Sequence, residues 1–344
     1  MGDRPRISRS TLPCLALLLA SPIAAQPSEW HDPSPHRTTL VTVEDGVQLE
    51  VLDWGGSGRA IVLLAGLGDT AHVFDDFAPL LAKNHRVYGI TRRGHGRSSA
   101  PSSGYELPRL AEDVVRVIGA LALSKPVVVG HSIAGEELHA LGARPATGVA
   151  GVVYLDAAFN RKRADGSESY DAVAKQLPPA PAPQEKDLAS FAALGAFLAK
   201  TQTGGGALPE AHLRARYLVN SDGSVGAAWM PAPAIRQSFT TEMRRMSESY
   251  DPARIRVPAL ALYAAPKSPA DLMRPWYPAD DPVVRKNVET LYELTRERLR
   301  RHVQWFEAFA DRGRVVEIPG AHHLFISHPR EVLRTIEGFV SSLD

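Results

Sequence analysis

The stretch that decides the fold is VVVGHSIAG, residues 127–135. Its first three residues form a continuous apolar run, which is typical of a strand buried on both faces. The residues around the serine, Gly130, Ala134 and Gly135, are small enough for a tight turn and for close approach of neighbouring strands. We therefore expect Ser132 to lie between a buried strand and the first turn of a helix.

A serine on such a turn is a candidate nucleophile. The N-terminus of the following helix brings partial positive charge close to Ser132, which favours an oxyanion that develops there. The strict pattern G-x-S-x-G is not met, because Ala134 stands at its fifth position, but alanine is nearly as small as glycine. The alternative is that Ser132 only caps the helix, which is a common use of serine.

Apolar strands alternate with helices on both sides of this stretch. Two strands around a turn at Asp45-Gly46 are expected within residues 39–54. Further strands are expected at 60–65, 86–90, 126–129, 151–155, 259–263 and 314–318, and helices at 73–83, 107–123 and 329–342. This alternation predicts an α/β fold with a mostly parallel central sheet flanked by helices on both faces.

Residues 159–255 interrupt the alternation. They contain a Pro/Ala tract at 177–183, the triplet Gly204–Gly206 and short helical stretches with apolar residues such as Phe191 and Leu194. A polar surface excursion would not need that apolar content. The segment is therefore interpreted as a helical lid inserted into a core formed by residues 38–158 and 256–344.

Two further loops follow core strands. The first is Ala65-Gly66-Leu67-Gly68, and an oxyanion hole would take one backbone N–H from this loop and one from the residue after the nucleophile. The candidate donors are Leu67 and Ile133, although an ordinary glycine-rich turn is the simpler interpretation of that loop. No G-x-G-x-x-G opens a helix here, so a dinucleotide site is a poor alternative.

The second loop is Pro319-Gly320-Ala321-His322-His323, after the last core strand. A general base must lie close to the serine, and this loop offers two histidines. Adjacent side chains point in different directions, so only one of them is expected to act as the base. The pair lacks the i, i+4 spacing that places two metal ligands on one helical face, so a metal site is not expected.

These segments, in this order, resemble the α/β-hydrolase fold family, in particular secreted bacterial serine esterases. The matching segments are AGLG at 65–68 for the family's H-G-x-G loop, RGHGRS at 93–98, GHS at 130–132 and PGAHH at 319–323 for its P-G-x-x-H loop. The departures are Ala65, where histidine is usual, and Thr91, where aspartate often precedes the R-G-x-G segment. The resemblance covers residues 38–344 and is least specific in the lid.

The resemblance implies a catalytic triad. It makes Ser132 the nucleophile and His323, rather than His322, the general base, from its place in the P-G-x-x-H loop. The acid usually follows the strand that ends here at Tyr263, where Asp271 comes a few residues late. Some members of the family use the end of the preceding strand, where this chain has Asp156. We take Asp156 as the acid and Asp271 as the alternative, ahead of Asp280, Asp281 or a glutamate.

The implied activity is hydrolysis of a carboxylic ester of a small to medium, partly apolar molecule through an acyl-enzyme on Ser132. An amidase, a lactonase or a C–C bond hydrolase could use the same triad, and a non-catalytic binding protein could share the fold. A serine nucleophile argues against the haloalkane dehalogenases and epoxide hydrolases of the family, which use an aspartate. No phosphate loop, metal cluster or cofactor motif is present, so neither a cofactor nor a metal is expected.

Composition excludes several other classes. The chain has 344 residues, 44% of them hydrophobic and 22% charged, which suits a globular core rather than disorder. With 39 basic and 38 acidic side chains the net charge is +1, so no overall field attracts nucleic acid. Cys14 is the single cysteine, so neither a disulfide framework nor a thiolate metal site can form.

The N-terminus predicts export. Three arginines (4, 6 and 9) precede an apolar run at 12–25, a pattern typical of a secretory signal peptide of about 25 residues. The run is too short and too interrupted by prolines to span a bilayer. Removal of residues 1–25 would change the net charge from +1 to −1 and leave no cysteine. The mature chain is thus expected to be secreted or periplasmic, without a membrane span.

Overall fold

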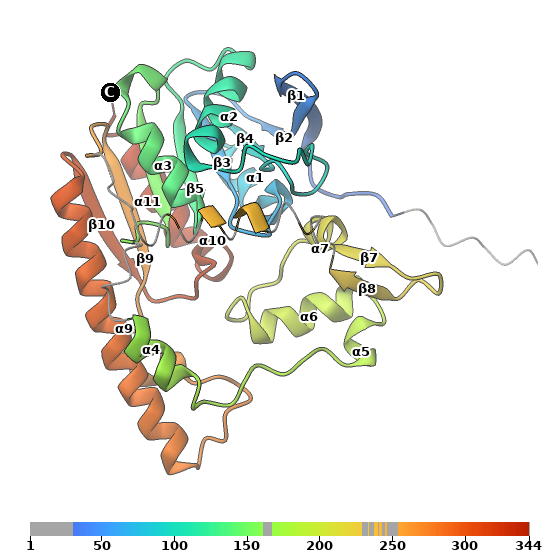
Figure 1. The fold of residues 1–344 in the computed structure, drawn as a ribbon, viewed down its shortest axis with the longest axis vertical. Coiled ribbons are helices and arrows are strands. Elements are labelled where there is room, and N and C mark those ends of the chain that lie inside the picture. Colours follow the sequence, from blue (N-terminus) through green and yellow to red (C-terminus); the bar gives the residue numbers. More distant parts are fainter. Residues whose placement is uncertain are drawn as a thin grey trace, which may run out of the picture. The chain divides into compact units, whose positions relative to one another are not determined.

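An eight-stranded sheet forms the centre of the fold, with the strand order β1-β2-β4-β3-β5-β6-β9-β10 (Figure 1). The strands are β1 (Arg37–Glu44), β2 (Val47–Gly55), β3 (Ala60–Leu64), β4 (Arg86–Ile90), β5 (Val127–His131), β6 (Gly151–Leu155), β9 (Ala259–Ala264) and β10 (Gly313–Ile318). Pairing is antiparallel between β1 and β2 and between β2 and β4. All other neighbours are parallel, which confirms the predicted mostly parallel sheet.

This computed structural model describes residues 30–160, 167–228 and 254–343, together with 233, 237–239, 241, 242 and 245. The predicted signal peptide at 1–25 lies outside these residues. The chain divides after Pro33, and the unit Ser34–Asp344 holds every element named below. None of the helices in the described ranges is long and apolar enough to cross a membrane.

The inner strands are apolar along their whole length because both faces of the sheet are covered. All five residues of β3, of β5 and of β6 are buried. Alternate side chains point to opposite faces, so Ile61 and Leu63 join one core cluster while Val62 and Leu64 join another. At the sheet edge, by contrast, the first four residues of β1 are exposed.

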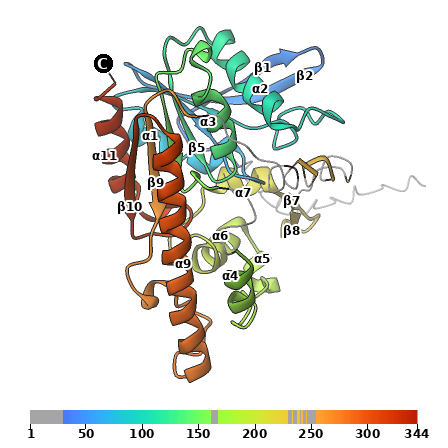
Figure 2. The same ribbon diagram turned by 60° about the vertical axis from the view of Figure 1, so that its left-hand side comes forward.

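Helices cover both faces of the sheet (Figure 2). One face carries η1 (Ala71–Phe74), α1 (Ala78–Leu81) and α11 (Pro329–Val340). The other carries α2 (Leu107–Ala120), α3 (Ala134–Gly142) and α9 (Pro282–Phe309). The expected helix at 73–83 is instead two short pieces, and Pro79 stands in the first turn of α1, where proline is tolerated.

The longest helix, α9, was not predicted. It runs for 28 residues, and Asp281 caps its N-terminus by accepting hydrogen bonds from the amides of Val283 and Val284. Its buried residues include Val284, Val288 and Leu291, a spacing of three and four that is a helical signal in the sequence itself.

The chain leaves the sheet after β6 and returns to it at β9, and the segment predicted as a lid lies between them. Its described elements are α4 (Ser167–Ala174), α5 (Glu185–Leu188), α6 (Phe191–Thr201), α7 (Glu210–Arg216) and a hairpin of β7 (Tyr217–Val219) with β8 (Val225–Ala228). Leu194 and Leu213 are buried with the core, as expected from the apolar content of the segment. Its action as a lid stays a prediction.

Candidate active site

Ser132 lies on the turn between β5 and α3 and has a strained backbone. Its φ is +55°, in the left-handed region that residues other than glycine seldom adopt. The amide of Ser132 donates to the carbonyl of Leu155 at 3.2 Å, which ties the turn to the end of β6. The turn is thus held in place by a hydrogen bond to a neighbouring strand.

Close packing explains the small residues around the serine. A Cβ on Gly135 would stand 2.1 Å from the carbonyl oxygen of Ala157, so this position admits only glycine. A Cβ on Gly130 would meet the Cβ of Ala134 at 3.0 Å. The position that demands glycine is therefore one residue beyond the fifth position of the strict pattern, and Ala134 fits where it stands.

Asp156 follows β6 and is oriented by the neighbouring strand. Its amide donates to the carbonyl of Leu262, and its Oδ1 accepts from the amide of Ala264 at 3.0 Å. Its Oδ2 lies 2.6 Å from Nδ1 of His322. Because an ionised carboxylate can only accept, the His322 ring donates here and is left with Nε2 as its other nitrogen.

The partner of Asp156 is therefore His322, and not His323, which the resemblance makes the general base. His323 Nε2 lies 3.7 Å from Oδ2 of a different carboxylate, Asp69. The side chain of His322 is 43% exposed, whereas that of His323 is 17% exposed. The histidine that meets the requirement for an acid partner is thus one residue earlier in the chain.

The packing of the next helix accounts for this difference. His323 is the residue before α10 (Leu324–Ser327), in which Leu324 and Phe325 are buried. The Phe325 ring packs on Phe74 of η1 with 4.7 Å between ring centroids. This contact fixes the start of α10 against η1, and His323 faces Asp69, which precedes η1 in the chain.

His131 links the serine turn to the histidine loop. Its Nε2 lies 3.1 Å from the carbonyl oxygen of His322, to which it donates, and the two rings are 4.5 Å apart between centroids. Burial, followed by the nearby rings of His322 and His323, lowers the pKa of His131 well below its usual value. A neutral His131 thus holds the loop of His322 beside Ser132.

Two of the alternative acids, Asp271 and Asp281, serve other purposes in the structure. Asp271 is exposed and caps the short helix η4 (Pro269–Leu272), where its Oδ2 accepts from the amides of Lys267 and Ser268 at 2.7 and 3.0 Å. Asp281 caps α9. Both carboxylates therefore serve helix starts that the sequence analysis did not predict.

The two candidate oxyanion donors lie on the loops expected for them. Leu67 is 51% exposed in the loop after β3, and Ile133 stands between Ser132 and α3. Within the described part of the chain, the amides of Leu67 and Ile133 donate to no backbone carbonyl. The role of these two amides as an oxyanion hole stays a prediction.

His95 and Arg92 hold the loop of Leu67, and the sequence analysis missed both residues. The amide of Gly68 donates to Nε2 of His95 at 3.2 Å. Burial, and next the charge of Arg92, lower the pKa of His95 to about 4, so the ring is neutral and can accept. Arg92 donates to the carbonyl of Ala65 at 3.1 Å and forms a buried ion pair with Glu137. The sequence signal for His95 was the RGHGRS segment at 93–98, which was matched to the family without a role for its histidine, and Arg92 directly precedes that segment.

Asp69 connects the same loop to the inserted segment. Its Oδ1 lies 3.3 Å from Nε2 of His212 and 3.1 Å from the Arg216 guanidinium, both on α7. Burial opposes ionisation of Asp69, but the neighbouring His212 and His323 rings and the charge of Arg216 outweigh it, so its pKa lies well below the usual value. Helix α7 is therefore anchored beside the active-site loops.

The inserted segment also contains a cavity of about 560 Å³. Its lining is mainly apolar and includes Leu194, Phe197, Leu198, Tyr217 and Val225. Ser132, Asp156 and His322 are not among the described residues that line it. This cavity is therefore separate from the serine turn.

Comparison with known proteins gives a family for most of the chain. Residues 61–335 match a family model described as the alpha/beta hydrolase family. A non-heme haloperoxidase from Rhodococcus erythropolis is 36% identical over 110 residues, which are 32% of this chain and 40% of that protein. Less than half of that relative is thus matched.

Solved structures are similar over a longer range and at lower identity. The crystal structure of E-2-(acetamidomethylene)succinate hydrolase has a TM-score of 0.58 and 21% identity, covering 89% of this chain and 99% of that one. Est816, described as an N-acyl homoserine lactone degrading enzyme, has a TM-score of 0.51 and 20% identity, covering 88% of this chain and 100% of that one. At these identities the similarity extends to the fold alone.

Proposed function

Because this chain belongs to the alpha/beta hydrolase family, we propose that it is a serine hydrolase that cleaves carboxylic esters through an acyl-enzyme on Ser132. The observation that carries the proposal is the 2.6 Å contact between Asp156 and His322, on a loop that His131 holds beside the serine. A nucleophile, a base and an acid that orients the base are the parts that such a reaction needs.

The first half of the reaction forms the acyl-enzyme. Nε2 of His322 takes the proton of the Ser132 hydroxyl while Oγ attacks the carbonyl carbon of the ester. The carbonyl oxygen becomes an oxyanion, which the amides of Leu67 and Ile133 stabilise together with the N-terminus of α3. When the tetrahedral intermediate collapses, His322 gives its proton to the departing alkoxide, and the alcohol leaves.

The second half of the reaction releases the carboxylic acid product and restores the free enzyme. His322 takes a proton from a water molecule, whose oxygen attacks the acyl carbon, and the ester bond to Oγ breaks as the proton passes to Ser132. Asp156 keeps its charge throughout, holding the ring in the tautomer with Nε2 free and stabilising the imidazolium that forms. The left-handed φ of Ser132 is a form of backbone strain that is common at active sites.

The proposed substrate is an ester of small to medium size with an apolar part. We base this substrate class on the inserted segment, which is apolar and which α7 anchors next to the loop of Leu67. A site that excludes water strengthens the electrostatic stabilisation of the oxyanion. Amides, lactones and C–C bonds would use the same residues and differ in the leaving group.

Labelling with a fluorophosphonate probe tests the nucleophile. The probe should modify the wild-type protein at one residue, and Ser132→Ala should abolish the modification. Ser124→Ala is the matched control, because Ser124 is exposed just before β5 and should leave labelling unchanged. Labelling that persists in Ser132→Ala would end the proposal.

A panel of aryl esters with acyl chains of increasing length tests the substrate class. Hydrolysis should depend on Ser132 and should fall once the acyl chain exceeds the space under the inserted segment. Matched amides and lactones belong in the same assay, since turnover of one of them in preference to every ester would reassign the leaving group.

We also propose that the protein is exported, with cleavage close to residue 25. N-terminal sequencing of the protein recovered from the periplasm or medium of an expressing bacterium checks this. A protein that keeps Met1 and stays inside the cell would contradict it.

A further inference from the structure

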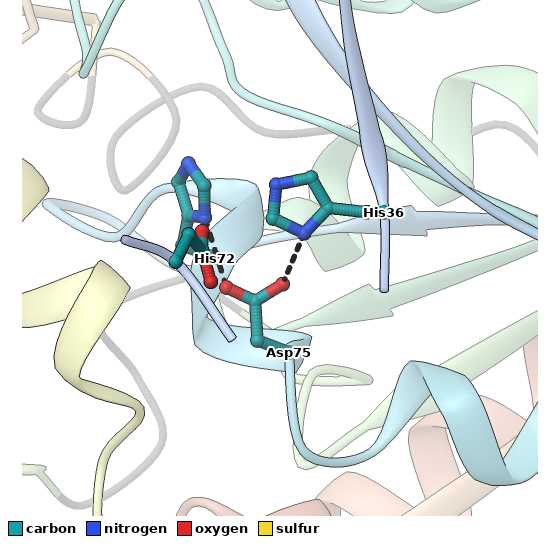
Figure 3. A group of neighbouring side chains, drawn as sticks. His36, His72 and Asp75 are labelled. Carbon is teal, nitrogen blue, oxygen red and sulfur yellow. Dashed lines mark hydrogen bonds and ion pairs between the residues drawn. The ribbon is translucent and has the colours of Figure 1, made fainter. Parts of the chain in front are cut away.

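A second cluster of titratable side chains lies outside the active site and is formed by His36, His72 and Asp75 (Figure 3). Nδ1 of His36 is 3.1 Å from Oδ1 of Asp75, and Nδ1 of His72 is 2.9 Å from its Oδ2. The two imidazole rings are 5.0 Å apart between centroids. All three side chains are at most 12% exposed, so two imidazoles converge on one buried carboxylate.

The three residues come from separate parts of the fold. His36 immediately precedes β1, His72 belongs to η1, and Asp75 follows η1. Ser34 donates to Oδ1 of Asp75 at 2.9 Å and accepts from the indole N–H of Trp54 on β2. The cluster thus joins the N-terminal segment of this unit to the first element after the Leu67 loop.

A fourth residue, Glu50, points at the same group. Glu50 is 1% exposed, and one of its oxygens accepts from the Thr91 hydroxyl at 2.8 Å. Its other oxygen, Oε1, has no hydrogen-bond partner among the described residues and lies 3.9 Å from Nε2 of His72. A buried carboxylate oxygen without a donor is costly unless a positive charge or a proton compensates it.

We propose that His36, His72 and Asp75 bind a divalent transition-metal ion, and that Glu50 orients His72 as a ligand. Two imidazoles and one carboxylate are donors that Zn²⁺ accepts readily, with water completing the coordination. A metal-bound histidine commonly gives its other N–H to a carboxylate, which is the relation of Glu50 to the far nitrogen of His72.

The distances fit such an ion. Ligand atoms at about 2.0–2.1 Å from a tetrahedral Zn²⁺ lie roughly 3.3 Å from one another. The two nitrogen–oxygen separations here, 3.1 and 2.9 Å, are within a few tenths of an ångström of that spacing. Small rotations of two side chains would therefore admit the ion between them.

The charges fit as well. Asp75 and Glu50 are two buried carboxylates, and both histidines are neutral when they act as ligands. A divalent cation balances the two negative charges without requiring either ring to be protonated. The bound ion would link residues 34–36 to η1. It would therefore raise the free energy of unfolding and take no part in the ester hydrolysis.

Metal binding to the full-length protein, stripped with a chelator, tests the proposal. Isothermal titration with Zn²⁺ at pH 7.5 should give one site per chain, and Co²⁺ should give the visible d–d absorption of a tetrahedral complex. His72→Gln should weaken Zn²⁺ binding by at least 100-fold and remove the Co²⁺ bands. Glu50→Gln should weaken binding by about 10- to 100-fold with the bands kept, as expected of a residue that acts through a ligand.

The matched control is His323→Ala, because Asp69, His131 and His323 form another group of possible ligand atoms within 4.8 Å of one another. That variant should bind Zn²⁺ as the wild type does. Near-UV circular dichroism shows that each variant is folded, and His36→Gln replaces His72→Gln if the latter is not. No Zn²⁺ binding by the wild type, binding unchanged in the folded cluster variant, or binding lost only in His323→Ala would overturn the proposal.

Discussion

Two neighbouring histidines each face a buried carboxylate, and the two pairs differ in their separation and in the exposure of the histidine. Asp156 and His322 are 2.6 Å apart, and the histidine is half-exposed beside the serine turn. Asp69 and His323 are 3.7 Å apart, and that carboxylate also serves the helix α7. A carboxylate–histidine pair is thus not enough to identify a catalytic base, because the second pair is part of the packing between the loops and the inserted segment.

Exchange of each histidine for alanine should separate the two pairs most clearly. His322→Ala removes the proposed base and should lower kcat for an aryl ester by about 10⁶-fold, since loss of the base costs nearly as much as loss of the whole triad. His323→Ala should change kcat by less than about tenfold. Steady-state kinetics on both purified variants measures this, and the reverse order of effects would restore His323 as the base.

The carboxylates should show the next largest difference. Asp156→Asn keeps the shape of the side chain but loses the charge that orients His322, and kcat should fall by about 10⁴-fold. Asp271→Asn touches only the cap of η4 and should retain nearly wild-type kcat. Equal losses in the two variants would argue against Asp156 as the acid.

Asp69→Asn should affect folding rather than chemistry. The change removes the charge that pairs with Arg216 and that lies beside His212. Because the Arg216 side chain is 31% exposed, the loss should be smaller than for a fully buried pair, roughly 2 kcal/mol of the free energy of unfolding. Urea titration followed by tryptophan fluorescence measures that loss. If Asp69→Asn is as stable as the wild type and its kcat falls as far as that of Asp156→Asn, then the Asp69–His323 pair would also act in catalysis, which would contradict the comparison.

The buried histidines behind the site should give the smallest effect, a loss of stability in acid. The pKa of His95 is about 4 in the folded protein and near 6.5 unfolded, so the unfolded chain binds the additional proton between these values. Stability therefore falls as the pH falls through this window, by about 2 kcal/mol between pH 7 and pH 5 for this residue.

His95→Gln checks that contribution, because an amide does not titrate but can still accept from the amide of Gly68. The difference in unfolding free energy between pH 7 and pH 5 should shrink by about 2 kcal/mol in the variant. An unchanged pH dependence would mean that His95 does not carry it. Burial also lowers the pKa of His139 to about 4. This residue is present in the wild type and in His95→Gln, so it contributes equally to the pH dependence of stability in the two proteins.

Much of the core was predictable from local patterns. The strand predicted at 86–90 coincides with β4, and the one at 151–155 coincides with β6. Continuous apolar runs of this kind indicate a strand that is buried on both faces, and they can be recognised within the strand's own residues. Helix α9 has a helical spacing of apolar residues in the sequence and was nevertheless not predicted. The helix predicted at 73–83 is two short helices in the structure.

The position of the serine follows from the sequence, since only a short strand, small residues and a helix start are needed to describe the turn. The partner residues do not follow in the same way. Asp156 and His322 are separated by 166 residues, and their contact depends on how β9 orients the carboxylate and how α10 packs on η1. Neither of these contacts can be recognised from residues that are adjacent in the sequence.

The sequence by itself therefore determined the layered α/β architecture and the serine turn, because both arise from the periodicity and size of adjacent residues. Only the tertiary structure decided which of the two adjacent histidines lies against Asp156 and which lies against Asp69. It also gathered His36, His72 and Asp75 into one buried group. The physical reason is the same in each case: the direction of a loop side chain is set by what packs against its neighbours from distant parts of the chain.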